Sequence, residues 1–341
     1  MTMTARANRG THQAHLPLFA QVEEPDVSGV AVRAFAHPAE QELARILTFF
    51  GLRWAYEPTT FALKRHPDGT ISEAFSPDFF LPDLHLYLEL TTMQQKLVTK
   101  KNRKARLLRE LYPNVRLRLI YRRDFLRMME CFRGELRRSD RTDLAGIVRT
   151  EQQIALAVDT IAHRLAARVH RAGTSSETPI VLAITNRGAR RFQQDVAAAL
   201  HGLGIATSEQ TLELVGDDTL GAKRRIRATA SALRHLQQGP VVLLETLVST
   251  GLTVGHAQRW MQERGVPLIG TMALFSRSSS LIGHAQLDHV AFDAPNDVIA
   301  GYGLQLHATH ADLPYVARVR ANSAEARDLL GEIVAEQTTR S

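Results

Sequence analysis

The sequence predicts an α/β protein of two parts, a mixed-sheet part followed by a part built on a parallel sheet. In residues 35–133, one helical pattern precedes several short strand patterns, a second helix and a further strand. From residue 150 onwards, buried apolar runs alternate with helical patterns, which is typical of a parallel sheet. The charge divides in the same way, because residues 1–150 hold 24 lysines and arginines against 17 acids, while residues 151–341 hold 18 of each.

The composition indicates a soluble globular protein with two cores, since the chain has 341 residues, of which 44% are apolar and 23% are charged. The one cysteine, Cys131, excludes a disulfide framework within the chain and favours a cytoplasmic location. We expect no membrane partner, because no apolar run is long enough to span a bilayer and the N-terminus lacks the apolar segment of a signal peptide. The basic first part predicts a polyanionic partner, foremost nucleic acid, and a solvated basic surface is the alternative.

The first 34 residues are rich in Thr, Ala, Gln and Pro without sustained periodicity, and they predict a disordered tail. One apolar patch in this tail, residues 15–19, is similar to the short peptides that dock on the bacterial sliding clamp. His15 stands where glutamine is usual in those peptides. A chance cluster or docking on the protein itself is the alternative.

Residues 38–50 predict a helix that begins at Pro38 and stops at Gly51. Its apolar face consists of Leu43, Ile46, Leu47 and Phe50. The acids in its first turn, Glu40 and Glu42, interact favourably with a helix N-terminus, which is the simplest reason for their presence.

Strand patterns follow this helix at residues 53–57, 60–64 and 71–80, with a turn at residues 66–69. The last of these strands carries Asp78 near its end. In residues 84–90, leucines alternate with His85, Tyr87 and Glu89, so the pattern predicts a strand with Glu89 on its polar face.

The acids Asp78 and Glu89 would thus lie on neighbouring strands, where their oxygens could hold a hard cation such as Mg²⁺ or Mn²⁺. Residues 94–112 predict a basic helix, and at 100° per residue Lys101 falls near the centre of its apolar arc. A buried lysine needs charged partners, and the two acids are the natural ones. The alternative is a Lys101 that extends outward to solvent from a loosely drawn apolar face.

The first part ends with a strand at residues 116–121, a short helix at 124–132 and a polar, charged linker at 134–149. Residues 75–104 resemble the core of the PD-(D/E)xK nuclease superfamily, with Asp78 and Glu89 as its two acids. The resemblance covers residues 35–133 and implies a restriction-endonuclease-like fold that hydrolyses phosphodiesters with a metal ion held by Asp78 and Glu89.

This sequence departs from the nuclease pattern at Thr91, where the superfamily has its lysine. We expect Lys101 to supply the missing cation, with the alternatives Lys96, Lys100 and Lys104. The resemblance also implies that Glu40 joins the metal site from the first helix, as in archaeal Holliday-junction resolvases, with Glu42 as the alternative.

The second part begins with a helix at residues 152–168, a buried strand at 179–185, a loop at 186–188 and a further helix. A second unit follows, made of a buried strand at 240–245, a tight turn at 249–253 and a helix at 254–264. Hydroxyls, a glycine and backbone N–H groups at the start of a helix make a phosphate cradle.

Residues 241–254 look like the PRPP-binding loop of type I phosphoribosyltransferases, and residues 288–316 resemble the C-terminal hood of hypoxanthine-guanine phosphoribosyltransferases. The match spans residues 150–320 and implies a parallel-sheet phosphoribosyltransferase domain over 150–330, followed by a tail at 331–341. The ligand-binding residues that the resemblance implies are Arg187, Gly188, Glu245, Ser249, Thr250, Gly251, Thr253 and Val290.

Several charged groups of those enzymes are replaced here, at positions that carry Thr246, Ser249, Ser276, Gln305 and Ala311. Losing such contacts weakens transition-state stabilisation by a few kcal/mol each, on the order of the effect of one oxyanion-hole donor. We therefore expect the second part to bind a nucleotide or PRPP-like ligand better than it makes one.

Our leading hypothesis is a Mg²⁺-dependent nuclease, acting on DNA in preference to RNA, whose second domain senses a nucleotide or PRPP-like ligand. One alternative is a purine (hypoxanthine/guanine) phosphoribosyltransferase with an accessory nucleic-acid-binding domain. A third hypothesis is a nucleic-acid-binding protein without enzymatic activity. The sequence leaves open whether the chain forms a homo-oligomer.

Overall fold

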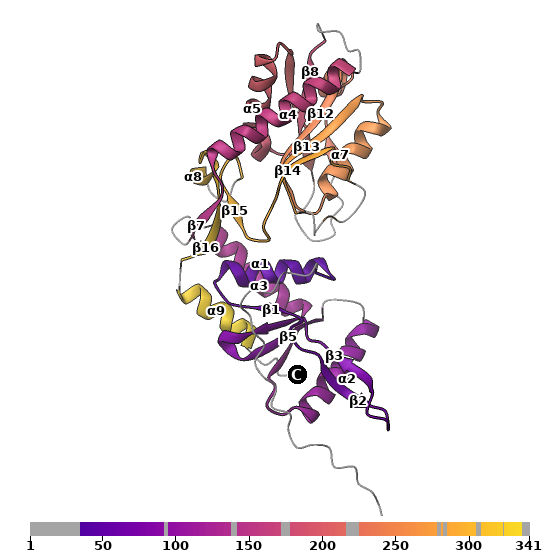
Figure 1. Cartoon of the computed structure of the whole chain (residues 1–341), viewed down its shortest axis with the longest axis vertical. Coiled ribbons are helices and arrows are strands. Elements are labelled where there is room, and N and C mark those ends of the chain that lie inside the picture. The colour runs from indigo at the N-terminus through magenta and orange to yellow at the C-terminus, as the bar shows by residue number, and fades with distance from the viewer. Residues whose placement is uncertain are drawn as a thin grey trace, which may run out of the picture.

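The computed structural model describes residues 35–91, 95–137, 142–171, 178–215, 225–277, 281, 285–304, 308–322 and 324–335. These residues form two lobes that follow one another along the long axis of the molecule (Figure 1). The expected N-terminal tail and its clamp-like patch lie outside the described residues. Within the described ranges, no helix combines the length and the apolar character needed to cross a membrane.

The N-terminal lobe is built on the four-stranded mixed sheet β1-β4-β5-β6, in which β5 and β6 are parallel and the other pairs antiparallel. Its strands are β1 (Ala55–Tyr56), β4 (Phe79–Leu81), β5 (Leu86–Thr91) and β6 (Leu117–Tyr121). Strands β2 (Phe61–Arg65) and β3 (Ile71–Phe75) form a separate hairpin, and η1 (Pro82–Leu84) connects β4 to β5.

Helices cover both faces of this sheet. One face packs against α1 (Pro38–Phe49) and α3 (Arg122–Leu136), and the other packs against α2 (Gln95–Leu111). Helix α1 starts where the sequence predicts, because His37 Nδ1 accepts from the Ala39 N–H and Glu40 Oε2 accepts from the His37 N–H.

Two expectations for this lobe are wrong. The strand expected at 71–80 is two strands in different sheets, because Pro77 has no N–H to continue a ladder and the chain leaves the hairpin after Phe75. Glu89 was expected on a polar face, yet β5 is buried on both faces and Glu89 is 2% exposed. Helix α2 covers the face that carries Glu89, and a pattern of alternating residues does not reveal such a cover.

The C-terminal lobe is a three-layer structure around the parallel sheet β14-β13-β12-β8-β9, as the sequence predicts. The strands are β8 (Ile180–Ile184), β9 (Thr207–Thr211), β12 (Val241–Val248), β13 (Leu268–Ser276) and β14 (His289–Asp293). Helices α4 (Glu151–Arg171) and α5 (Arg190–Gly202) pack on one face, and α6 (Ala230–Leu236) and α7 (Leu252–Glu263) on the other. A short ladder of β10 (Glu213–Val215) and β11 (Arg225–Arg227) lies beside α7.

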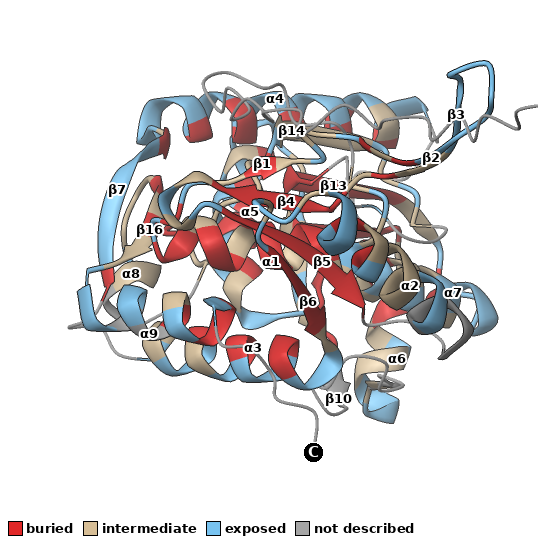
Figure 2. Ribbon diagram, turned by 90° about the horizontal axis from the view of Figure 1, so that it is seen from below, coloured by how far each residue is buried: buried red, intermediate tan, exposed pale blue. Residues whose placement is uncertain are grey.

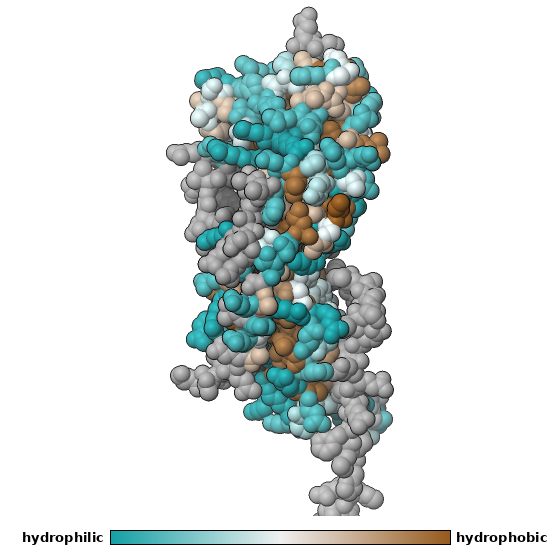
Figure 3. All heavy atoms as spheres, turned by 90° about the vertical axis from the view of Figure 1, so that its left-hand side faces the viewer, coloured by the Kyte–Doolittle hydropathy of each residue, from teal (hydrophilic) through white to brown (hydrophobic). Residues whose placement is uncertain are grey.

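The expected linker at 134–149 is structured in the part that is described. Helix α3 continues to Leu136, and β7 (Thr142–Arg149) pairs with β16 (Val316–Ala321), which pairs with β15 (Ile299–Ala300). Strand β7 exposes Leu144 and Ile147. On the side of the molecule seen in Figure 3, apolar residues lie among hydrophilic ones. A partner strand that is 170 residues away in sequence cannot be foreseen from the composition of the segment.

The chain returns to the N-terminal lobe at its end, after α8 (Ala308–Ala311) and β16. Helix α9 (Ala324–Ala335) packs beside α3, and Figure 2 shows the two helices next to one another with their buried residues turned inward. Its buried residues Leu330, Ile333 and Val334 join the core formed by α1, α3 and the sheet. Residues 331–335 are therefore part of a helix and not of a tail, because their apolar side chains follow the helical spacing and find an apolar surface.

Candidate functional site

The structure brings Asp78 and Glu89 together in the N-terminal lobe. The backbone N–H of Asp78 donates to Glu89 Oε2 at 3.3 Å, and the N–H of Leu90 donates to Asp78 Oδ2 at 2.6 Å. The two residues are only 7% and 2% exposed. We refer to Asp78, Glu89 and the neighbouring Lys101 as the acid cluster.

Lys101 reaches this pair from α2. Its ammonium lies 2.5 Å from Glu89 Oε1 and donates to the Leu90 carbonyl at 2.6 Å. Of the alternative lysines, Lys104 donates instead to the Ala74 carbonyl at 2.7 Å, and Lys100 is exposed. The side chain of Lys96 lies outside the described residues.

Burial raises the pKa of both carboxyls. Burial, then the charge of Glu89, raises the pKa of Asp78 to about 7, and burial also raises the pKa of Glu89 against the opposing effect of Lys101. Burial lowers the pKa of Lys101, but the charges of Glu89 and Asp78 more than offset this and raise it. Near neutral pH Asp78 is therefore close to its pKa, beside a lysine whose pKa lies above its usual value.

Glu40 is the acid of α1 that faces this cluster. It accepts a hydrogen bond from the Tyr56 hydroxyl at 2.7 Å, and its charge raises the pKa of both Asp78 and Glu89. Glu42 instead pairs with Arg45 at 2.5 Å. The geometry thus favours Glu40 over Glu42 as the third acid, although no group of three His, Cys, Asp or Glu among the described residues has the arrangement of a metal site.

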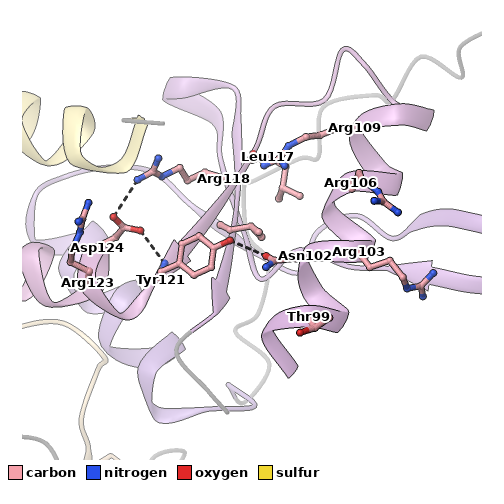
Figure 4. A pocket seen from close by; sticks show the side chains of 11 residues that line it. Thr99, Asn102, Arg103, Arg106, Arg109, Leu117, Arg118, Tyr121, Arg123 and Asp124 are labelled. Carbon is pink, nitrogen blue, oxygen red and sulfur yellow. Dashed lines mark hydrogen bonds and ion pairs between the residues drawn. The ribbon is translucent and has the colours of Figure 1, made fainter. Parts of the chain in front are cut away.

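A groove of about 1230 Å³ lies next to the acid cluster, between α2 and the edge strand β6. Leu119 of β6 pairs with Glu89 in register, so the groove begins one strand away from the acids. Figure 4 shows the arginines of α2 on one side and Arg118, Arg123 and Asp124 on the other. The charged lining residues are Arg103, Arg106, Arg109, Arg118, Arg123 and Asp124. We call this feature the arginine groove.

In the C-terminal lobe, residues 249–251 connect β12 to α7 and present the start of α7 at the carboxyl edge of the sheet. Gly251 has φ +74°, a left-handed conformation that glycine adopts without strain. Ser249 Oγ accepts a hydrogen bond from Arg277 Nη1 at 2.6 Å. Thr250 and Thr253 are half-buried on the same turn. We call residues 249–253 the phosphate loop.

Glu245, expected to bind ribose, points toward the neighbouring strand. Its Oε1 accepts from the N–H and hydroxyl of Thr185, and its Oε2 accepts from Asn186 Nδ2 at 2.7 Å. It is 2% exposed, and burial raises its pKa to about 7 despite these three donors. A ligand would have to reorganise these contacts to use both carboxylate oxygens.

Arg187 and Gly188 lie in η3 (Arg187–Ala189), beside the phosphate loop's strand. The Gly188 carbonyl accepts from the Thr246 hydroxyl at 3.2 Å, and a Cβ on Gly188 would lie 2.9 Å from the Gly303 carbonyl oxygen. This close approach requires glycine at position 188. Val290 is half-buried on β14, packed against the α7 side of the core.

The positions where charged groups of phosphoribosyltransferases are replaced differ in their surroundings. Ser276 is fully buried at the end of β13, and Ala311 ends the short helix α8. Gln305 lies outside the described residues.

Sequence reasoning missed Arg277, Tyr56 and Asn186. Arg277 directly follows the apolar run of β13, at the strand end where α/β sheets bind ligands, and that position was the available signal. Tyr56 and Asn186 act through hydrogen bonds to distant acids, which local patterns do not indicate.

Comparison with known proteins supports one of the two resemblances. No protein-family model matches the chain. Over about half of its length, however, the chain is similar in sequence to purine phosphoribosyltransferases.

The hypoxanthine-guanine phosphoribosyltransferase of Mycobacterium avium is 24% identical over 174 residues, which are 51% of this chain and 85% of that protein. The enzyme of the same name from Dictyostelium discoideum is 23% identical over 145 residues, 41% of this chain and 79% of that protein. Among solved structures, the hypoxanthine phosphoribosyltransferase from Trypanosoma cruzi in complex with IMP aligns with a TM-score of 0.47 at 23% identity, covering 52% of this chain and 95% of that chain. None of these proteins is a nuclease, and the nuclease-like part stays a prediction.

Proposed function

We propose that residues 150–330 bind PRPP or a purine nucleoside monophosphate, in the manner of a hypoxanthine-guanine phosphoribosyltransferase. The observation that carries this proposal is the similarity to such enzymes over 174 residues. The phosphate loop supports it, because N–H groups at the start of the twelve-residue helix α7 can donate to a phosphate.

The chemistry of the site favours ligand binding over fast transfer. The hydroxyls of Ser249, Thr250 and Thr253 can donate to a phosphate, and Arg187 would approach a pyrophosphate from η3. Transfer further requires charge compensation of the departing pyrophosphate and activation of the purine. Ser249, Ser276 and Ala311, which stand where those enzymes carry charged groups, have neutral side chains and supply neither.

Calorimetry with PRPP, IMP and GMP tests binding, and a pyrophosphate-release assay with PRPP and hypoxanthine or guanine tests transfer. Both are run with Mg²⁺ and with EDTA. We expect binding of at least one ligand and slow release of pyrophosphate. Rapid turnover would establish a working transferase, whereas absence of binding to all three ligands would contradict the proposal.

The acid cluster supports a second candidate function, metal-dependent hydrolysis of phosphodiesters. The supporting observation is the 2.5 Å contact of Lys101 with Glu89, beside an Asp78 that shares the site. This combination provides two carboxylates and a cation in one buried place, although the lysine comes from α2 and not from the strand.

The donors of this site suit a hard cation. Asp78 and Glu89 would hold Mg²⁺ or Mn²⁺ through carboxylate oxygens, with Glu40 nearby, and the bound ion would polarise a phosphate and lower the pKa of a bound water. Lys101 would keep Glu89 oriented and offset its charge. Because the pKa of Asp78 is raised to about 7, metal binding near neutral pH would release the proton that this carboxyl partly holds.

The arginine groove supports a nucleic acid as partner for this candidate. Five of its lining residues are arginines and one is an aspartate, which pairs with Arg118 at 3.5 Å. Arginine binds phosphate oxygens through two parallel donors, and a row of arginines suits a chain of phosphates.

Cleavage of labelled DNA and RNA by the wild type, in Mg²⁺, in Mn²⁺ and in EDTA, tests the second candidate. Asp78→Asn and Lys101→Met are compared with the wild type, and Lys100→Met is the matched control on an exposed position of the same helix. We expect metal-dependent cleavage that both active-site variants lose and the control keeps. Equal cleavage by the wild type and Asp78→Asn would rule out this site.

A further inference from the structure

Arg277 occupies the edge of the ligand site and is almost fully buried. Its N–H donates to the Val248 carbonyl at 2.9 Å, which fixes the residue next to the phosphate loop. The residue is 5% exposed, and its guanidinium makes three hydrogen bonds. Nη1 donates to Ser249 Oγ at 2.6 Å, Nε to the Pro295 carbonyl at 3.0 Å, and Nη2 to the Asp297 carbonyl at 2.8 Å.

All three acceptors of this buried cation are neutral. Among the described residues, no carboxylate forms an ion pair with Arg277 within 4.0 Å, since Asp297 directs its side chain to Arg318 and Arg320. Burial, then the nearby charge of Arg45, lowers the pKa of Arg277 to about 9, although the charges of Glu42 and Asp297, which do not form an ion pair with it, partly oppose this. A buried charge without a counter-charge is unfavourable, so an anion placed beside it would be stabilised.

The two carbonyl acceptors of Arg277 belong to Pro295 and Asp297, the residues on either side of Asn296. Asn296 itself contacts the N-terminal lobe. The Asn296 carbonyl accepts from Arg45 Nε at 3.3 Å, and Asn296 Nδ2 donates to the Gln41 carbonyl at 3.2 Å. Gln41 and Arg45 belong to α1, which lies on the side of the N-terminal lobe that faces the C-terminal lobe (Figure 1). The phosphate loop is therefore connected to α1 in three steps: from Ser249 to Arg277, from Arg277 to the carbonyls on either side of Asn296, and from Asn296 to α1.

We propose that Arg277 is a positioning residue that responds to an anionic ligand on the phosphate loop and transmits the occupancy of that loop to α1. A phosphate is a stronger acceptor for a guanidinium than the Ser249 hydroxyl, because hydrogen bonds between charged groups are stronger than those to neutral groups. A bound phosphate would draw Nη1 toward itself and tighten or release the carbonyls on either side of Asn296. The inference rests on the phosphoribosyl ligand proposed above.

Helix α1 also carries Glu40, so it links this connection to the acid cluster of the N-terminal lobe. Glu40 precedes Gln41 in α1 and faces the acid cluster from there, with its carboxylate accepting a hydrogen bond from the Tyr56 hydroxyl at 2.7 Å. A ligand that shifts α1 would therefore change the electrostatics of the acid cluster in the other lobe. Coupling between two sites is reciprocal, so an ion bound at the acid cluster would change ligand affinity by the same factor.

The test measures ligand affinity by calorimetry and the hydrogen–deuterium exchange of α1 amides with and without PRPP, IMP or GMP. In the wild type, we expect a ligand to change exchange in α1. Arg277→Met should weaken binding about tenfold or more, as expected for a lost hydrogen bond to a charged group. Asn296→Ala should keep ligand affinity within about twofold but reduce the change in α1, because it removes the side-chain contact with Gln41 and leaves the Asn296 carbonyl to accept from Arg45.

Arg277→Lys and Arg264→Lys complete the experiment. Lysine keeps the charge at position 277, but its compact ammonium lacks the planar, spread donors with which arginine reaches three separated acceptors, so partial affinity with no change in α1 is expected. Arg264→Lys, on the outer end of α7, should behave as the wild type. If Arg277→Met fails to fold, Asn296→Ala decides alone. Ligand binding without any change in α1, or a change in Asn296→Ala as large as in the wild type, would overturn the inference. No binding by the wild type would overturn the proposed function and the inference with it.

Discussion

Two buried carboxyl groups with a pKa of about 7 differ in what compensates their charge. Asp78 lies near the charged Lys101, whereas Glu245 has only the neutral donors of Thr185 and Asn186. Burial is the largest cause of the shift at both residues. Hydrogen bonds alone therefore stabilise the ionised form of Glu245. Its pKa differs between the folded and the unfolded chain, so the free energy of unfolding depends on pH through this residue.

We expect the free energy of unfolding to fall as pH rises from 5 to 8, in part because of Glu245. In the unfolded chain this carboxyl loses its proton near 4.5, and in the folded chain near 7, so the unfolded state binds fewer protons between these values. The contribution of Glu245 to the free energy of unfolding is fully present below about pH 4.5 and is lost as pH rises through 7. Each unit of difference in pKa corresponds to about 1.4 kcal/mol.

Glu245→Gln should remove this contribution, measured by urea unfolding at pH 5 and pH 8. Gln retains the shape, and the Asn186 amide can turn to accept from it. The pH-dependent difference between wild type and variant isolates Glu245, because Asp78 and Glu89 titrate in both. An identical pH dependence in the two proteins would contradict the raised pKa.

Lys101→Met should destabilise the protein at pH 8, since it leaves Glu89, 3% exposed in its side chain, without its counter-charge. We expect a loss of about 1–3 kcal/mol in the free energy of unfolding, the lower part of the range for broken buried pairs because Lys101 is itself one-third exposed. The loss should shrink as the pH is lowered, because burial raises the pKa of Glu89 above its usual value and the carboxyl becomes neutral more readily. The double variant with Glu89→Gln should recover most of it, and an additive effect would show that the pair does not interact.

At the scale of elements, the turn between β12 and α7 depends on Gly251. A Cβ there would lie 3.0 Å from Ala285 Cβ and 3.3 Å from Leu281 Cδ2, in a residue with φ +74°. We expect Gly251→Ala to cost about 1–3 kcal/mol of stability and to weaken phosphate-ligand binding. Gly265→Ala is the matched control, because it has a similar φ of +64° and no atom within 4 Å. Equal losses in the two variants, by thermal unfolding and calorimetry, would show that backbone strain alone is responsible.

Helix α9 lies near the end of the described chain but contributes to the core of the N-terminal lobe. Leu330 is fully buried in the core shared with α1 and α3, so Leu330→Ala should lower the free energy of unfolding by about 2–5 kcal/mol. Leu156→Ala on α4, where the side chain is 69% exposed, should have an effect within about 0.5 kcal/mol. Comparable destabilisation by both would mean that α9 does not pack on the N-terminal lobe in solution.

At the scale of the whole molecule, the excess positive charge of residues 1–150 is displayed partly in the arginine groove. Arg106→Gln with Arg109→Gln should weaken nucleic-acid binding and reduce the slope of log K against log salt by about 2, one for each lost phosphate contact. Arg133→Gln, exposed on α3 outside the groove, is the control. Fluorescence anisotropy in EDTA separates binding from cleavage. An unchanged slope in the double variant would place the polyanion elsewhere or exclude it.

The sequence by itself determined the elements that local forces specify. The capped start of α1, the apolar run of β12 with its glycine turn, and the parallel C-terminal sheet follow from residues close to one another in the chain. It also predicted that Asp78, Glu89 and Lys101 lie close together, and the structure brings them together although Asp78 lies between β3 and β4 and not in one strand. Their common burial, however, depends on α2 lying over β5.

Only the tertiary structure decided which distant surfaces meet. It paired β7 with β16, packed α9 against α3, turned Glu245 toward Asn186 and placed Arg277 beside the segment whose Asn296 contacts α1. The physical reason is that the periodicity of apolar residues depends only on the helix or strand that contains them. The contacts above join residues that are about 60 to 250 positions apart, and the packing of whole elements brings these residues together.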